Sequence, residues 1–138
     1  RSRFYPDTER VMGWDIGTTG FSIVLSADVP DMVLAHARDD VDAFLADHDL
    51  TRADIDTWVR HTGGPKVLQA FETALELDDD ALALSWASLE NVGNLSSASV
   101  LHVLADTQSQ TRPASGSKAL MMAMGPGFCA EMVLMEWT

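Results

Sequence analysis

The sequence is poor in cysteine and in positive charge. Its 138 residues include one cysteine, Cys129, so no internal disulfide can form, and a small secreted domain held together by disulfides is excluded. Nine Lys and Arg stand against 21 Asp and Glu, which gives a net charge of −12. Because nucleic-acid binding requires clustered basic side chains, we expect no nucleic-acid partner.

Long apolar runs are missing as well. No stretch approaches the roughly 20 apolar residues that a helix needs to cross a bilayer, and no secretory signal opens the chain. We therefore expect no membrane association and a cytoplasmic location. The 46% of apolar and 22% of charged residues are ordinary for a globular protein, and the length fits one domain with a real core.

Regular patterning begins abruptly at Val11. Residues 1–10 show neither a capping signal nor a core pattern, so we interpret them as a lead-in from a missing N-terminal half and residues 11–138 as the domain. Apolar and β-branched runs at 11–16 and 21–25, separated by a glycine-containing turn, predict paired strands.

Helical and extended patterns alternate along the rest of the chain. Apolar residues recur at helical spacing in 32–45, 67–77 and 78–89, and Ser96 or Ser97 could cap a further helix. Thr51 and Asp54 form a capping pair before a short helical turn. Strands are predicted at 57–60, 118–124 and 128–137, with a surface loop at 107–117. This order predicts a layered α/β domain with a mixed sheet of five strands.

Three loops combine polar residues with glycine at the predicted ends of strands or helices, where sites form in open α/β sheets. His61 leaves a buried strand into Gly63, Gly64 and Pro65, where small backbone allows close approach of a ligand. From chemistry alone, such a histidine is as often structural as catalytic. Asn94 precedes a predicted helix and by itself would be interpreted as a helix cap.

The third loop is Gly125, Pro126 and Gly127, between two apolar strands. By itself it is typical of a tight turn. Other histidines have no partner pattern, and with one cysteine they show no metal-ligand spacing, so we predict no metal site.

Taken together and in this order, the three loops resemble the C-terminal half of type III polyketide synthases, the chalcone and stilbene synthase family. The segment Met12-Gly-Trp-Asp15 with Gly20-Phe21, and Asp28-Val-Pro30, also resemble that family, so the similarity spans about Val11 to Trp137. The Gly-Gly-Pro after the histidine is the discriminating feature. The resemblance implies a thiolase-like half, α/β in class, that packs against an N-terminal half.

The resemblance also implies roles for individual residues. His61 and Asn94 match the histidine and asparagine of a Cys-His-Asn triad whose cysteine belongs to the N-terminal half. Gly63, Gly64, Pro65 and Lys66 match the loop beside the pantetheine tunnel, although Lys66 could equally be a solvated lysine. The residues that match the cavity wall are Ser96, Gly125, Pro126, Gly127 and Ile23, the last at a position where plant members often have an aromatic gate.

The implied reaction joins a starter acyl-CoA to malonyl-CoA by decarboxylative Claisen condensation. Its substrates are CoA thioesters, and no cofactor is needed. Family members are usually homodimers, and the implied partners are acyl-CoA, malonyl-CoA and the N-terminal half.

Three other interpretations are open at this stage. A ketoacyl-synthase-like enzyme would use a carrier protein, which prefers a basic docking patch that this acidic chain lacks. A non-catalytic, thiolase-derived binding or structural module is a further possibility. Cys129 could also complete a papain-type Cys-His-Asn set within the chain, but its neighbours Phe128 and Ala130 favour a buried structural thiol.

Overall fold

The computed structural model describes residues 1–138 and has two sheets with helices packed around the larger one. The larger sheet has four strands in the order β1-β6-β5-β4, and the smaller one is a hairpin of two. The strands are β1 (Ser2–Phe4), β2 (Met12–Gly17), β3 (Gly20–Leu25), β4 (Thr57–Arg60), β5 (Lys118–Gly125) and β6 (Cys129–Glu136). The helices are α1 (Val29–Ala46), α2 (Pro65–Leu75), α3 (Ala83–Val92) and α4 (Ala98–Asp106).

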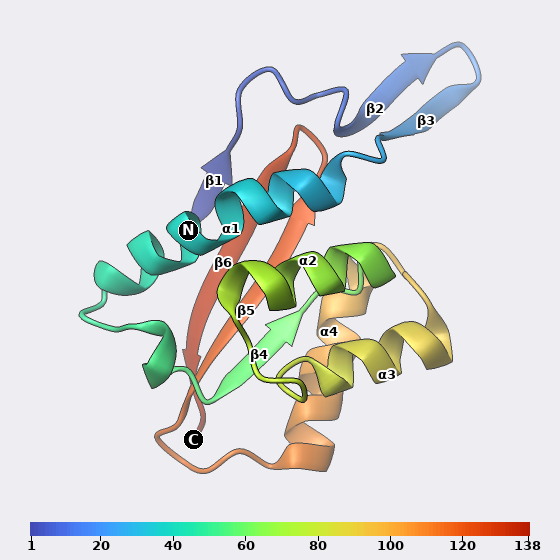
Figure 1. Ribbon diagram of the computed structural model, residues 1–138. Coiled ribbons are helices and arrows are strands. Elements are labelled where there is room, and N and C mark those ends of the chain that lie inside the picture. Colours follow the sequence, from blue (N-terminus) through green and yellow to red (C-terminus); the bar gives the residue numbers. More distant parts are fainter.

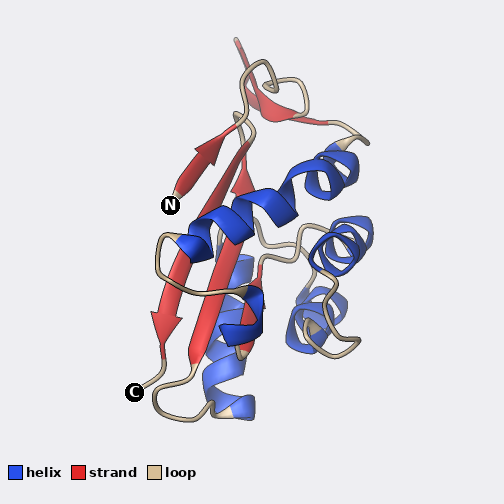
Figure 2. Ribbon diagram, turned by 60° about the vertical axis from the view of Figure 1, so that its left-hand side comes forward, coloured by secondary structure: helices blue, strands red, loops and turns tan.

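The larger sheet is mixed, because β4 pairs with β5 in parallel while β5–β6 and β6–β1 are antiparallel. Helices α1 and α2 cover one face, and α4 lies behind the sheet (Figures 1 and 2). The main core joins α1 and α2 to β5 and β6, and includes Val41, Leu68, Phe71, Leu120 and Met132. A second small core joins Val59 of β4 to Val100 and Val103 of α4 on the other face.

The prediction of one five-stranded sheet is wrong in its strand count. The hairpin β2–β3 pairs only with itself and projects beyond the sheet, as Figure 1 shows. The fourth strand of the sheet is instead β1, which pairs with β6. Strand β1 lies within residues 1–10, where no regular structure was expected. Tyr5 directly after β1 is buried against Phe128, so this segment contributes to the core.

The start of one helix differs from the prediction, and the cap of another lacks the expected side-chain hydrogen bond. Helix α3 begins at Ala83, and the acidic residues 78–80 lie in the turn before it. Helix α4 begins at Ala98 with Ser97 at its N-cap, but no side-chain hydrogen bond caps it there. The capping box of Thr51 and Asp54 is present around the turn Arg52–Asp54, as predicted. The predicted loop at 107–117 begins with a π-helical turn, Thr107–Thr111.

Candidate functional site

His61 lies at the carboxyl end of β4. Its backbone N–H donates to the carbonyl of Met122 on the neighbouring parallel strand β5, at 3.0 Å. The carboxyl ends of parallel strands lie at the same edge of a sheet. The turn Gly125–Gly127 after β5 therefore lies at the edge where His61 leaves the sheet (Figure 1).

Two glycines carry the chain from His61 into α2. Gly64 is the N-cap of α2 and has a φ of 129°, a conformation that side chains with a Cβ rarely adopt. Gly63 has ordinary φ, but a Cβ there would lie 3.3 Å from Val67 Cγ1 and 3.7 Å from His61 Cδ2. Pro65 occupies the first turn of α2, where its missing N–H costs nothing. The loop is therefore tight at Gly63 and conformationally demanding at Gly64.

Asn94 lies in the loop between α3 and α4 and is exposed. Its Oδ1 accepts a hydrogen bond from the Ser96 backbone N–H at 2.9 Å, so the asparagine holds a turn rather than capping α4. Because this bond fixes the oxygen, the NH2 group keeps its two donors free within the domain. The geometry thus presents Asn94 as a hydrogen-bond donor.

A hydrogen bond joins the His61 loop to the Asn94 loop. Thr62 is fully buried, and its Oγ1 donates to the carbonyl of Gly93 at 3.4 Å. Gly93 has a φ of 76° and ends α3. The structure therefore connects the two predicted catalytic residues through their sequence neighbours.

The predicted cavity-wall residues form a second group. The Gly127 N–H donates to the carbonyl of Met12 at 2.8 Å, which ties the turn Gly125–Gly127 to the base of the hairpin that carries Ile23. Ile23 is 60% exposed, and Ser96 is exposed in the Asn94 loop. The hydrogen bonds therefore tie the predicted site residues into two groups, one around His61 and Asn94 and one around the turn Gly125–Gly127 and the hairpin.

Burial and a neighbouring charge set the protonation of His61. Desolvation, with a smaller contribution from Arg60, lowers the pKa of His61 to about 4, and its Nδ1 is buried without a partner. The imidazole of this domain is therefore neutral at pH 7. A neutral imidazole with its proton on Nε2 is a hydrogen-bond donor toward a substrate oxygen.

Sequence reasoning missed Arg60. This side chain is 3% exposed, its guanidinium carbon lies 3.6 Å from the centroid of the Phe71 ring, and no carboxylate pairs with it. The available signal was an arginine at the end of a short strand, after Trp58 and Val59 and directly before His61, since charged residues are rarely buried without a partner.

The position of Cys129 does not favour a catalytic set within this chain. Cys129 starts β6, and β5 lies between β6 and the strand that leads to His61. Two strand spacings amount to about 10 Å, and Cys129 lies opposite Gly125, three residues beyond the Met122 carbonyl that binds the His61 N–H, so the backbones are offset along the strands as well. Burial and the charge of Glu131 also raise the pKa of the Cys129 thiol, the opposite of what a reactive cysteine requires.

No three or more His, Cys, Asp or Glu side chains gather in an arrangement that could hold a metal ion. None of the helices combines the length and the apolar character that a bilayer crossing requires.

The fold places the chain among thiolase-like α/β domains, as comparison with solved structures shows. The 1,3,6,8-tetrahydroxynaphthalene synthase of Streptomyces coelicolor, a bacterial type III polyketide synthase, superposes with a TM-score of 0.92 at 32% identity, over 100% of this chain and 39% of that one. A polyketide synthase from the brown alga Ectocarpus siliculosus superposes with a TM-score of 0.90 at 26% identity, over 100% of this chain and 38% of that one.

Sequence comparison defines the family. Residues 1–137 match the model of the C-terminal domain of chalcone and stilbene synthases. The 1,3,6,8-tetrahydroxynaphthalene synthase of Streptomyces peucetius is 55% identical over 99% of this chain and 36% of its own length. A putative chalcone synthase of Bacillus subtilis is 35% identical over 94% of this chain and 36% of its own length.

The chain belongs to the chalcone and stilbene synthase family, the type III polyketide synthases, as their C-terminal domain. It spans about a third of the length of these relatives. The family match begins at residue 1, so it includes β1 as well as the domain expected from Val11 onward.

Proposed function

We propose that this chain is the C-terminal domain of a type III polyketide synthase that condenses a starter acyl-CoA with malonyl-CoA. The observation that carries the proposal is the place of His61, at the carboxyl end of β4 and tied through Thr62 to the loop of Asn94. Family membership supports the same reaction. The reactive cysteine would come from a part of the protein outside these 138 residues.

The proposed reaction uses His61 and Asn94 as hydrogen-bond donors. The imidazole of His61 takes the proton of the cysteine thiol, and the resulting imidazolium stabilises the thiolate. The thiolate accepts the starter acyl group from CoA, and CoA leaves as the thiol with that proton. Malonyl-CoA then loses carbon dioxide, and its electron pair moves onto the thioester as an enolate. His61 Nε2–H and the Asn94 amide would hold the enolate oxygen; one such donor contributes about 3 kcal/mol in other enzymes. The enolate carbon attacks the acyl thioester, extends the chain by two carbons and releases the thiolate.

The proposed CoA contacts lie at the start of α2. Gly63, Gly64 and Pro65 present backbone to the pantetheine arm, and Lys66 follows with an exposed side chain. The Lys66 N–H lies in the first turn of α2, where backbone N–H groups have no partner within the helix. Lys66 could thus contribute a backbone donor as well as a positive charge.

Ile23, Ser96, Gly125, Pro126 and Gly127 are proposed to shape the wall of the cavity. An isoleucine in place of an aromatic ring at position 23 widens the space available to the growing chain. The 55% identity to a 1,3,6,8-tetrahydroxynaphthalene synthase supports an aromatic product of that type. We propose CoA thioesters as the substrates, no cofactor, and a cytoplasmic location.

The proposed protein partner is the N-terminal half of the same enzyme, and the complete enzyme is proposed to be a homodimer. One face of the hairpin β2–β3 supports the first proposal. Trp14, Ile16, Phe21 and Ile23 lie on that face, opposite one another in the strand register, and each is at least 51% exposed. An apolar face of this kind is typical of a surface that another part of a protein covers.

The decisive experiment replaces His61 with alanine in the complete enzyme and measures carbon dioxide release from malonyl-CoA. We expect a loss of at least about 100-fold, because one oxyanion donor disappears. His102→Ala is the matched control, since His102 is an exposed histidine of α4, and it should retain the activity of the parent enzyme. Unchanged decarboxylation in His61→Ala would overturn the proposal.

A further inference from the structure

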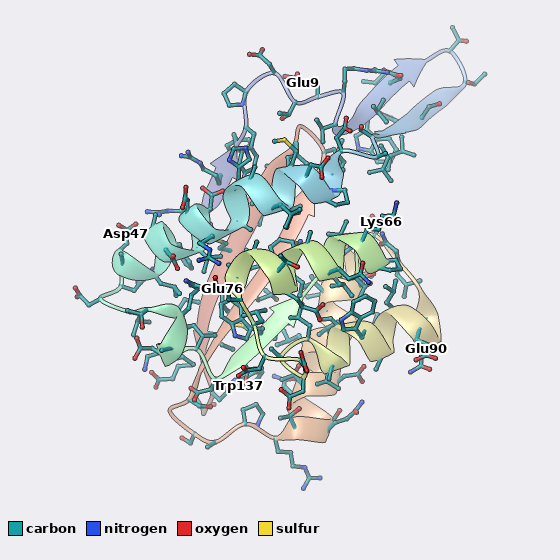
Figure 3. All side chains as sticks on the ribbon, in the orientation of Figure 1. Glu9, Asp47, Lys66, Glu76, Glu90 and Trp137 are labelled. Atoms are coloured by element: carbon teal, nitrogen blue, oxygen red, sulfur yellow. The ribbon has the colours of Figure 1, made fainter.

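Helix α3 turns two serines toward the inside of the domain. Its buried residues are Ser85 and Ser88, while Glu90 is exposed and points away from the sheet in Figure 3. Because serine side chains bury little apolar area, the position of this face of the helix depends on its hydrogen bonds. The helix ends at Gly93, and Asn94 is the next residue. The position of α3 therefore determines where Asn94 lies.

Two hydrogen bonds join α3 to the residues on either side of His61. Ser85 Oγ, near the start of the helix, donates to the Arg60 carbonyl at 3.0 Å. Thr62 Oγ1 donates to the carbonyl of Gly93, at the end of the helix, at 3.4 Å. Thr62 is completely buried, and a buried hydroxyl that loses its partner is costly. Both ends of α3 are therefore tied to the segment that carries His61.

The two proposed donors are held by different parts of the domain. The backbone N–H of His61 donates to the Met122 carbonyl of β5 at 3.0 Å, so the sheet fixes the histidine without help from α3. Asn94 lies in a loop, and its Oδ1 accepts the backbone N–H of Ser96, so its amide group moves with that loop. Loss of the Thr62 hydrogen bond would therefore shift Asn94 relative to His61 and leave the histidine in its place.

We propose that Thr62 is a positioning residue that sets the distance between the His61 and Asn94 donors, with the Ser85 hydrogen bond as a second tie. The inference rests on the proposed function of these two donors in holding the enolate oxygen. Both donors must lie about 2.7–3.1 Å from the same oxygen, and a displacement of about 1 Å can lower a rate by about 100-fold. The hydroxyl of Thr62 thus contributes to catalysis through the place of Asn94.

The test uses variants of the complete enzyme. Thr62→Val removes the hydroxyl at nearly constant shape, and Thr62→Ser keeps the donor. Thr107→Val is the matched control, because Thr107 is also buried and its Oγ1 also donates to a backbone carbonyl, that of Val103 at 2.8 Å, at the end of α4 away from the Asn94 loop. For each variant we would measure carbon dioxide release from malonyl-CoA and the rate at which iodoacetamide alkylates the reactive cysteine.

We expect Thr62→Val to release carbon dioxide at least about 10-fold more slowly, because the enolate oxygen keeps only one well-placed donor. Its alkylation rate should match that of the parent, since formation of the thiolate depends on His61 and not on Asn94. Thr62→Ser should restore most of the carbon dioxide release. Thr107→Val should match the parent in both measurements, although it too loses a buried hydrogen bond.

A double variant shows whether Thr62 acts through Asn94. Asn94→Ala should lower carbon dioxide release by at least about 100-fold. Adding Thr62→Val to it should lower the release no further, because the donor that Thr62 positions is already gone. If Thr62→Val does not fold, Ser85→Ala removes the second tie and should show the same selective loss, again with no further loss in Asn94→Ala.

Unchanged carbon dioxide release in Thr62→Val would overturn the inference, and so would an equal loss from Thr62→Val with and without the Asn94 amide. A failure of the proposed function gives a different result, because Asn94→Ala would then release carbon dioxide as fast as the parent. If Asn94→Ala is slow while Thr62→Val is as fast as the parent, the reaction stands and the role of Thr62 is wrong.

Discussion

The protonation of His61 couples the candidate site to the stability of the domain. Its pKa is lowered from 6.5 to about 4 in the folded state, so between these values the unfolded chain binds a proton that the folded chain does not. The contribution of His61 therefore favours folding above about pH 6.5 and is lost progressively as the pH falls toward 4.

We predict that His61→Gln will lose less stability on acidification than the parent chain. The expected difference between pH 7 and pH 4.5 is on the order of 1–2 kcal/mol, reduced from the full pKa shift because the imidazole is partly exposed. Urea unfolding of both proteins at the two pH values measures it. Equal losses in the two proteins would contradict the depressed pKa.

The two glycines after His61 should respond differently to alanine. Gly64→Ala places a Cβ in open space but at a φ of 129°, so the cost is backbone strain of about 1–3 kcal/mol. Gly63→Ala keeps an ordinary φ and asks Val67 to shift by a few tenths of an ångström, which should cost less than about 1 kcal/mol. Denaturant unfolding measures the loss in free energy of unfolding for each variant. A larger loss in Gly63→Ala than in Gly64→Ala would contradict the prediction.

Short-range chemistry made some elements predictable from sequence. The capping box at Thr51 and Asp54 and the strand 57–60 follow from local residue types, and both are present as predicted. The contribution of β1 was not predictable, because its three residues gain their partner from β6, more than 120 positions away. The isolation of the hairpin was missed for a related reason, since an alternating pattern indicates a strand but not the sheet that it joins.

The same limit applies to the candidate site. The motifs around His61 and Asn94 were recognisable as residue types at a given spacing. The hydrogen bond from Thr62 to Gly93, which connects the two loops, depends on tertiary contact and left no pattern in the sequence. The burial of Arg60 likewise depends on Phe71 of a separate helix packing over it.

The side chain of Tyr5 is expected to hold β1 against β6 and α1. Its ring is 7% exposed and packs on Phe128 and His36, and its hydroxyl donates to Asp40 of α1. We expect Tyr5→Ala to lower the free energy of unfolding by about 3 kcal/mol or more through lost packing. Tyr5→Phe, which loses only the hydrogen bond, should cost about 1 kcal/mol.

Hydrogen exchange provides the second measurement for β1. In Tyr5→Ala the amides of β6 that pair with β1 should lose protection, while those that pair with β5 should keep it. If Tyr5→Ala has the same free energy of unfolding and the same exchange rates as the parent, the Tyr5 side chain does not hold β1.

The hairpin β2–β3 leaves large apolar side chains exposed on one face of the molecule. Ile16 and Phe21 face each other across β2 and β3 and are 76% and 70% exposed. Burying such side chains is worth about 1.5–3 kcal/mol each, and in the chain by itself that energy is not gained. The chain alone should therefore bind hydrophobic dyes and self-associate through this face.

That exposure can be removed by substitution on the hairpin. Replacing Ile16 and Phe21 together with serine should suppress dye binding and self-association of the chain while its Tm changes little, because neither side chain contributes to the core. In the complete enzyme the same double variant should be destabilised, since there the face would be covered by the N-terminal half. Ser22→Ala, next to Phe21 but on the opposite face of the hairpin, is the matched control and should change neither protein. A double variant that leaves the complete enzyme as stable as its parent would contradict the proposal that the hairpin face is an interface between the two halves.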